Sequence, residues 1–238
     1  MSQVQSENVP QTLPRAELSA GQRDEMFALL SRHFAGVTRM QFEADLSEKT
    51  WVILLRRDGR LVGFSTLLAQ AGAFNRQPIT AIYSGDTIVA PEAWGTTTLS
   101  RAWIACVRRL RENYPNRKCY WLFLTSGFRT YRFLPVFWRE FYPRFDAPTP
   151  PNLKQLQDDL AQDRFGGQYQ AVEGIVRFKN PQQLREGLRN IADGRMTDPH
   201  IAFFISKNPG HAAGDELVCL TELSDDNLTA AGRRMIES

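Results

Sequence analysis

The chain has 238 residues, of which 42% are hydrophobic and 23% are charged, and its formal net charge is +3. These values are ordinary for a globular protein with a sizeable core, and they exclude a largely disordered chain. A bilayer-spanning helix needs roughly 20 consecutive apolar residues, and no apolar run approaches that length. The N-terminal residues are polar and lack the apolar stretch of a signal peptide, so we expect a cytoplasmic protein.

The three cysteines are widely spaced, and each has apolar neighbours, where cysteine usually behaves as a small hydrophobe. They are Cys106, Cys119 and Cys219. Neither these residues nor the three histidines show the spacing of metal ligands, so we predict no metal site. Positive charge is concentrated between Arg101 and Arg144, which favours a phosphate-bearing ligand or an acidic partner. This charge does not alternate with aromatic residues along a strand, so we predict no nucleic-acid binding.

The predicted elements begin after a polar tail of residues 1–14. Apolar residues at helical spacing predict two helices, and apolar runs on either side of Asp58-Gly59 predict a β-hairpin. A longer strand follows and ends before Pro91. In chain order, these elements are helices at 24–34 and 41–49, hairpin strands at 51–56 and 61–70, and a strand at 79–90.

The most regular helical pattern in the chain covers residues 95–113. A strand that is apolar on both faces follows at 118–127, as expected for a central strand. Residues 128–143 then predict an aromatic-rich helix, interrupted at Pro135. A strand, a helix and a second strand in this order favour a parallel pair within an otherwise antiparallel sheet. Ligands bind such sheets beyond the carboxyl ends of the parallel strands, here 89–95 and 125–129.

The last third of the chain follows a Pro-rich stretch at 146–152. We predict a helix at 153–163, a strand at 169–178, a helix opening at Asn180-Pro181, strands at 200–206 and 216–223, and a short helix near Ser224. His211 lies in the loop between the last two strands, where it is either a base near a substrate or part of an exposed turn.

A hairpin, a long strand, a loop, a helix and a buried strand, in this order, resemble the GNAT acyltransferase superfamily over about residues 15–145. The resemblance implies an α/β (α+β) fold with a GNAT-like mixed central sheet, flanking helices and a C-terminal extension. In that family a loop with the signature Arg/Gln-x-x-Gly-x-Gly/Ala holds the pyrophosphate of coenzyme A. Here the corresponding stretch, 92–97, keeps the central glycine but has Glu92 and Thr97 at the flanking signature positions.

The resemblance implies a thioester donor, either acyl-CoA or an acylated carrier protein, that is bound by this loop and the helix behind it. A helix N-terminus offers unpaired N–H donors and a partial positive charge, which suit a phosphate group. The predicted binding residues are Val89, Gly95, Thr96, Thr97, Thr98, Arg101 and Arg129. Alternatively, Gly95 only provides the backbone conformation at the entry to the helix, and the threonines only cap the helix.

The acceptor amine must lose a proton before it attacks a thioester. In the family a carboxylate on the central strand often serves as the base, and here Ser84-Gly85-Asp86 interrupts an otherwise apolar strand. Asp is disfavoured in strands and Gly weakens them, so a bulge or a splayed strand that admits a ligand would explain the pair. The alternative is an exposed turn at the strand end. We predict Asp86 as the base.

Tyr131 is the predicted acid for the departing thiolate, although a plain core role is the alternative. It belongs to an aromatic segment that either packs on the sheet or forms a channel for an acyl chain longer than acetyl. This segment includes Tyr131, Phe133, Phe137, Trp138, Phe141 and Tyr142.

The resemblance thus implies an N-acyltransferase that acts on an amine of a small molecule, an amino acid or a peptide Lys or ornithine side chain. Fatty-acyl transfer to a ribosomal peptide is compatible with it, and so is a homodimer. The alternative is a catalytically inactive GNAT-like protein that binds a ligand or a partner. We expect a flexible tail at 1–14, an acyltransferase core at 15–145, a linker at 146–152 and, at 153–238, a part that completes the sheet and covers the acceptor side.

Overall fold

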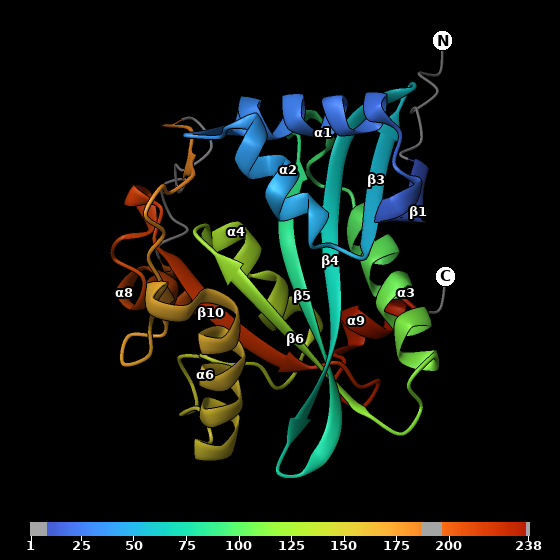
Figure 1. Ribbon diagram of the computed structural model, residues 1–238. Helices are drawn as coiled ribbons and strands as arrows, with labels where there is room; N and C mark the ends of the chain where they lie inside the picture. Colours follow the sequence, from blue (N-terminus) through green and yellow to red (C-terminus); the bar gives the residue numbers. More distant parts are fainter. Residues whose placement is uncertain (1–8, 187–196, 237–238) are drawn as a thin grey trace. The chain divides into compact units, whose positions relative to one another are not determined.

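The computed structural model describes residues 9–186 and 197–236, and its largest feature is a mixed sheet of eight strands (Figure 1). The strand order is β1-β3-β4-β5-β6-β10-β8-β7, and a second, two-stranded sheet pairs β2 with β9. The predicted fold class, a mixed central sheet with flanking helices, is confirmed. The chain divides into two compact units.

The first unit comprises the described parts of Met1–His33, together with Val37–Ala69 and Ser84–Pro115. Its elements are β1 (Val9–Pro14), α1 (Ala20–His33), α2 (Arg39–Ser47), β3 (Trp51–Arg57), most of β4 (Arg60–Phe74), the second half of β5 (Gln77–Val89) and α3 (Thr98–Glu112).

The predicted hairpin of this unit is confirmed. β3 pairs with β4 in antiparallel register, and both Asp58 and Gly59 at its turn have positive φ angles, of 51° and 77°. Residues 9–14, which we expected within the flexible tail, instead form β1 and pair with β3. Pairing of β1 covers one edge of β3, which satisfies backbone groups that an edge strand would leave open. The predicted helix at 95–113 is α3, which packs against β1 and β3.

The second unit comprises Phe34–Gly36, Gln70–Tyr83 and the described part of Asn116–Ser238. Its further elements are β2 (Phe34–Ala35), β6 (Lys118–Thr125), α4 (Phe128–Tyr131), α5 (Phe133–Phe137), α6 (Pro151–Phe165), β7 (Tyr169–Gln170), β8 (Ile175–Val176), β9 (Gln183–Leu184), α8 (Pro199–Lys207), β10 (Glu216–Glu222) and α9 (Ala230–Arg234). β6 pairs with β10 and is buried along most of its length, as its apolar sequence predicts.

Residues 200–206, which we predicted as a strand, lie in helix α8. The Asp198 side chain caps this helix by accepting a hydrogen bond from His200 N at 3.0 Å, and Pro199 occupies its first turn. Asp followed by Pro is a strong helix start. Ile201 and Phe204 then bury one face at a spacing of three residues. The strand predicted at 200–206 is therefore wrong, whereas the strand predicted at 216–223 is β10, which pairs with β6 and β8.

Three other predictions for the second half of the chain also differ from the structure. The predicted strand at 169–178 is a hairpin of β7 and β8, which turns at Gly174 with a φ of +73°. In place of a helix opening at Asn180-Pro181, the short strand β9 follows, and residues 187–196 of that prediction lie outside the described part. The predicted helix near Ser224 is α9, which begins at Ala230.

The aromatic segment 128–143 forms two short helices, α4 and α5, and then an extended stretch. This stretch runs beside the C-terminal part of the second unit through isolated bridges from Trp138 to Leu228 and from Tyr142 to Leu220. The end of α5 at Phe137 has its carbonyl bound by Thr229 N at 3.0 Å. The helix predicted across the whole segment is therefore wrong beyond Phe137.

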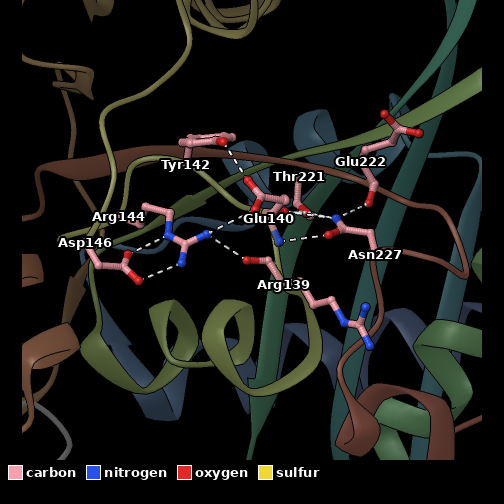
Figure 2. Close-up of polar contacts among 8 residues, drawn as sticks. All are labelled: Arg139, Glu140, Tyr142, Arg144, Asp146, Thr221, Glu222 and Asn227. Atoms are coloured by element: carbon pink, nitrogen blue, oxygen red, sulfur yellow. Dashed lines mark hydrogen bonds and ion pairs between the residues drawn. The ribbon is translucent and has the colours of Figure 1, made fainter.

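A network of polar side chains fixes this extended stretch (Figure 2). The buried Asn227 side chain donates hydrogen bonds to the carbonyls of Glu140 (2.9 Å) and Glu222 (2.8 Å) and to Thr221 Oγ1 (3.1 Å). Its Oδ1 accepts a fourth bond from Glu140 N at 2.8 Å. The Asn227 amide therefore bonds both backbone groups of Glu140 and the carbonyl of Glu222, while Thr221 Oγ1 also donates to the Glu140 carbonyl at 2.6 Å.

A second part of the same network involves Arg144 (Figure 2). Its guanidinium binds both carboxylate oxygens of Asp146, at 2.5 and 2.6 Å, and donates to the carbonyl of Arg139 at 2.7 Å. This pair lowers the pKa of the Asp146 carboxyl below its ordinary value. A bidentate ion pair fixes the relative orientation of its two side chains as well as attracting them. The pair therefore holds the chain after Tyr142 in one conformation.

Candidate functional site

The polar segment Ser84-Gly85-Asp86 lies inside β5 rather than at its end. The alternative reading of an exposed strand-end turn is therefore wrong. Ser84 is buried, and its Oγ accepts a hydrogen bond from Trp103 Nε1 of α3 at 3.2 Å. Asp86 is half-buried. β5 also passes from one compact unit to the other between Tyr83 and Ser84, directly before this segment.

Gly85 is explained by a close approach of two side chains. A Cβ atom at this position would come within 2.4 Å of Lys49 Cε and 2.6 Å of Thr66 Oγ1. Real Cβ atoms almost never approach other atoms so closely, so only glycine fits here without displacing its neighbours. The Lys49 Nζ atom lies 3.3 Å from the same position. Gly85 therefore gives a lysine ammonium access to the middle of the strand.

Lys49 is a buried cation, with only 5% of its surface exposed. It follows the last residues of α2, and its Nζ donates to the carbonyl of Asp45 at 2.8 Å. Carbonyl groups at a helix C-terminus carry partial negative charge, which favours a cation there. The next residue, Thr50, donates from its backbone N to Leu67 O at 2.8 Å, which ties the chain after Lys49 to β4.

Burial raises the pKa of Asp86 from 3.8 to about 6. Removing a carboxylate from water disfavours its charged form, and this effect is the largest one at Asp86. The ammonium of Lys49 opposes it and lowers the pKa, whereas the Asp45 carboxylate raises it. Asp86 is therefore mostly ionised at pH 7 but binds a proton near neutrality, which is the behaviour of an effective general base.

The loop after β5 begins with a 3-10 turn, Pro91–Ala93, and reaches α3 through Gly95, whose φ is +84°. A Cβ at Gly95 would meet no atom within 4 Å, so glycine is required here by backbone conformation and not by crowding. The indole of Trp94 is 42% exposed and donates from Nε1 to Val89 O at 2.8 Å.

Exposed residues, 94–97, lead into α3. Thr97 occupies the N-cap position, yet its side chain makes no capping hydrogen bond, and Thr96 Oγ1 instead donates to Ala93 O at 3.1 Å. Arg101 donates from Nε to Thr97 Oγ1 at 3.2 Å, which brings its guanidinium to the same end of the helix. Thr98 is half-buried at the first helical position. The Thr97 side chain therefore does not cap the first N–H groups of the helix.

Arg129 and Tyr131, the two predicted site residues of the second unit, lie on α4. The Arg129 guanidinium is 5.2 Å from the ring centre of Phe128. Tyr131 is fully buried, its hydroxyl donates to Pro143 O at 2.9 Å, and its ring packs against Phe204. Burial raises the pKa of Tyr131 strongly. This tyrosine keeps its proton and has the environment of a core residue.

The aromatic segment around Tyr131 is mostly core as well. Phe137, Trp138, Phe141 and Tyr142 are all at most 6% exposed, whereas Phe133 is 36% exposed. His211 lies in a 3-10 turn, His211–Ala213, with its ring 5.6 Å from that of Phe204.

None of the helices in residues 9–186 and 197–236 has the length and hydropathy of a transmembrane span. No group of three or more His, Cys, Asp or Glu in this part could hold a metal ion. Cys106, Cys119 and Cys219 are buried free thiols.

Comparisons with known proteins found no matching family model and no matching curated protein. Among solved structures, a conserved protein of unknown function from Enterococcus faecalis V583, titled a probable N-acyltransferase, is 12% identical with a TM-score of 0.44, covering 91% of this chain and 66% of its own. The GNAT family N-acetyltransferase YhbS from Escherichia coli, solved with CoA, is 11% identical with a TM-score of 0.41, covering 56% and 71%. Escherichia coli ElaA is 16% identical with a TM-score of 0.39, covering 59% and 95%.

GNAT acetyltransferases are thus among the solved structures that this chain is similar to. All three TM-scores lie below 0.5, so we base the function on the residues of the chain itself.

Proposed function

We propose that the chain is an N-acyltransferase that moves an acyl group from acyl-CoA to an amine, with Asp86 as the general base. The observation that supports this most directly is the place of Asp86, a half-buried carboxyl within β5 whose pKa is raised to about 6. Ionisable residues whose pKa is shifted by burial and by a neighbouring charge are common at functional sites.

The acceptor nitrogen must lose two protons in the reaction. Asp86, directly or through a water, takes the first from the ammonium, and the free amine nitrogen attacks the thioester carbonyl carbon. As the C–S bond breaks and the amide forms, the nitrogen gives its second proton to solvent, and the thiolate of coenzyme A leaves and takes up a proton. A positioned base contributes about 10² to 10⁴ in rate. Because Tyr131 is buried and its hydroxyl is already bound to Pro143 O, we assign the protonation of the thiolate to solvent rather than to Tyr131.

The donor phosphates are proposed to bind at the loop that follows β5. Gly95 and the first turn of α3, which the Thr97 side chain does not cap, offer backbone N–H groups, and Arg101 adds a positive charge at the same helix end. Such a helix terminus binds phosphate through both its donors and its dipole. Thr96, Thr97 and Thr98 line this turn, and Val89 closes the strand before it. The exposed Glu92 is a fixed negative charge in the loop and would disfavour phosphate.

A thermal-shift titration tests the proposed donor. Free coenzyme A and acyl-CoAs from acetyl to palmitoyl would be added to the purified protein. A ligand at about 100 times its dissociation constant stabilises the folded state by roughly 2.7 kcal/mol. Stabilisation that grows with chain length would support a fatty-acyl donor. If no acyl-CoA stabilised the protein, the proposed acyl-CoA donor would be wrong. An acylated carrier protein would then be the donor to test.

Release of coenzyme A thiol, measured with a panel of amino acids, peptides and small amines, tests the catalytic part. Asp86→Asn should lower the rate about 10²-fold or more, since it removes the base and keeps the shape. Asp58→Asn, at the exposed β3–β4 turn, makes the same chemical change outside the site and serves as the control. Binding of acyl-CoA without any turnover in wild type would favour the alternative of an inactive ligand-binding protein.

A further inference from the structure

The cation that acts on the candidate base was not indicated by any motif. Lys49 lies between α2 and β3, where a single lysine in a sequence usually reads as an exposed surface residue. In the structure it is one of the buried polar residues of the first unit, and it lies against the backbone of Gly85, next to Asp86. A buried lysine calls for an explanation, because removing an ammonium from water is costly unless it is compensated.

Two of the groups around Lys49 compensate its ammonium. One is the Asp45 carbonyl, which accepts a hydrogen bond from Lys49 Nζ at 2.8 Å and belongs to the C-terminal turn of α2. The other is the Asp86 carboxylate, on which the charge of Lys49 acts directly. The charged groups that act on Asp86 thus come from α2 and the residues directly after it, with Lys49 attracting its negative charge and Asp45 repelling it.

The local backbone keeps this arrangement in place. Lys49 N donates to Leu46 O at 3.1 Å, and Thr50 is bonded to Leu67 O of β4 through its backbone N. On the other side, Gly85 leaves the space that the end of the lysine side chain fills. Thr66 Oγ1, also against Gly85, is buried and has no hydrogen-bond partner among the described residues. The lysine therefore has little room to move away from the strand.

We propose that Lys49 is a positioning residue for the base: its buried ammonium, fixed on the end of α2, compensates the charge of Asp86 and keeps this carboxyl ionised at neutral pH. This inference rests on the proposed role of Asp86 in acyl transfer. Without the lysine, burial would raise the pKa of Asp86 further, so a larger fraction of this carboxyl would be protonated at neutral pH, and a protonated carboxyl cannot accept the proton of an incoming ammonium.

The test is a pH titration of Asp86 by carbon-13 NMR of protein labelled at the aspartate side-chain carboxyl, with the Asp86 signal assigned by its loss in Asp86→Asn. In wild type the signal should titrate near pH 6. Lys49→Gln removes the charge and retains a donor for Asp45 O, so the midpoint should move upward by about one pH unit or more. Lys49→Met removes both and should shift it in the same direction.

The matched control is Lys118→Met, which removes the same unit charge from an exposed lysine on β6 that pairs with Glu222. It should leave the Asp86 midpoint unchanged. Folding of each variant is checked by its unfolding curve, and if Lys49→Met fails to fold, Lys49→Gln alone decides the outcome. An Asp86 midpoint that does not move in folded Lys49→Gln would overturn the inference.

The NMR titration and the activity assay test the two proposals independently. If Asp86→Asn retains full transfer activity, the proposed base is wrong even where the NMR coupling is seen. If Asp86→Asn is inactive but the titration midpoint of Asp86 is the same in Lys49→Gln as in wild type, only the proposed role of the lysine is wrong. With both correct, the acid limb of the kcat/KM profile moves to higher pH in Lys49→Gln, a change that a merely structural lysine would not produce.

Discussion

The side-chain amide of Asn227 pairs with both backbone groups of Glu140, accepting from its N at 2.8 Å and donating to its O at 2.9 Å (Figure 2). Such a pair imitates the hydrogen bonds of a neighbouring strand. It fixes the chain at Glu140, between the isolated bridges of Trp138 with Leu228 and of Tyr142 with Leu220. One side chain from a distant part of the sequence therefore helps to hold the extended stretch after α5.

Asn227→Ala should destabilise the protein by about 2–3 kcal/mol, because it removes the hydrogen bonds of this buried amide to Glu140 N, to the carbonyls of Glu140 and Glu222 and to Thr221 Oγ1. Denaturant unfolding measures the change. Asn152→Ala, at an exposed position of α6, is the control and should stay within about 0.5 kcal/mol of wild type. Equal stabilities of the two variants would show that the amide of Asn227 is dispensable.

Gly85→Ala should destabilise the protein by about 1–3 kcal/mol, because its Cβ would collide with Lys49 Cε and with Thr66 Oγ1. Thr66 is β-branched and buried, so it cannot turn away easily. Gly72→Ala, also in a strand, is the control, since its Cβ would meet Ile79 at an ordinary 3.5 Å. If both alanine variants unfold at the wild-type denaturant midpoint, the crowding at Gly85 is relieved at no cost.

The raised pKa of Asp86 predicts a pH dependence of stability. Between pH 3.8 and about 6 the folded protein binds this proton more tightly than the unfolded chain does. The free energy of unfolding therefore contains a contribution from Asp86 that is fully present below pH 3.8 and is lost as the pH rises towards about 6. A shift of this size corresponds to roughly 3 kcal/mol.

Asp86→Asn lacks this contribution, so the difference in unfolding free energy between wild type and variant should shrink as the pH rises from 4 to 7. Urea unfolding at pH 4, 5, 6 and 7 measures it, and other titrating groups cancel in the difference. The unfolding free energy of Asp58→Asn, a variant at the exposed hairpin turn, should change with pH in the same way as that of wild type. A difference for Asp86→Asn that is constant with pH would mean that Asp86 titrates at an ordinary pKa.

Gly95→Ala should weaken binding of coenzyme A by about tenfold, because alanine strains a backbone with a φ of +84° and shifts the loop before α3. Gly127→Ala is the matched control, since Gly127 also has open space around it but a φ of −129° that alanine adopts readily. Isothermal titration with coenzyme A compares the two. Unchanged affinity in Gly95→Ala would place the phosphates elsewhere.

Local sequence patterns were sufficient for much of the first unit and the central strands. The apolar periodicity of α3, the Asp58-Gly59 turn and the continuous apolar run of β6 each follow from short-range rules. The polar break at Asp86 also stood out, because a charge in an apolar strand has few explanations. These features depend on neighbours in the sequence.

The rest depended on neighbours in space. The apolar residues 200–206 fit a strand or a helix equally well by composition, and the cap at Asp198 with Pro199 decided for α8. Lys49 carried no signal of its own, since nothing in the sequence shows that it is buried. The available signal was Gly85, because an isolated glycine in a strand often marks a close approach. The identity of the approaching side chain required the structure.

The contact between Lys49 and Gly85 has a consequence for how related sequences vary. Since a Cβ at position 85 would occupy the space of the lysine side chain, the two positions cannot change independently. A homologue with alanine or serine in place of Gly85 should have a shorter residue in place of Lys49. Conversely, homologues that keep this lysine should keep the glycine, so the pair should appear as covarying columns although 36 positions separate them along the chain.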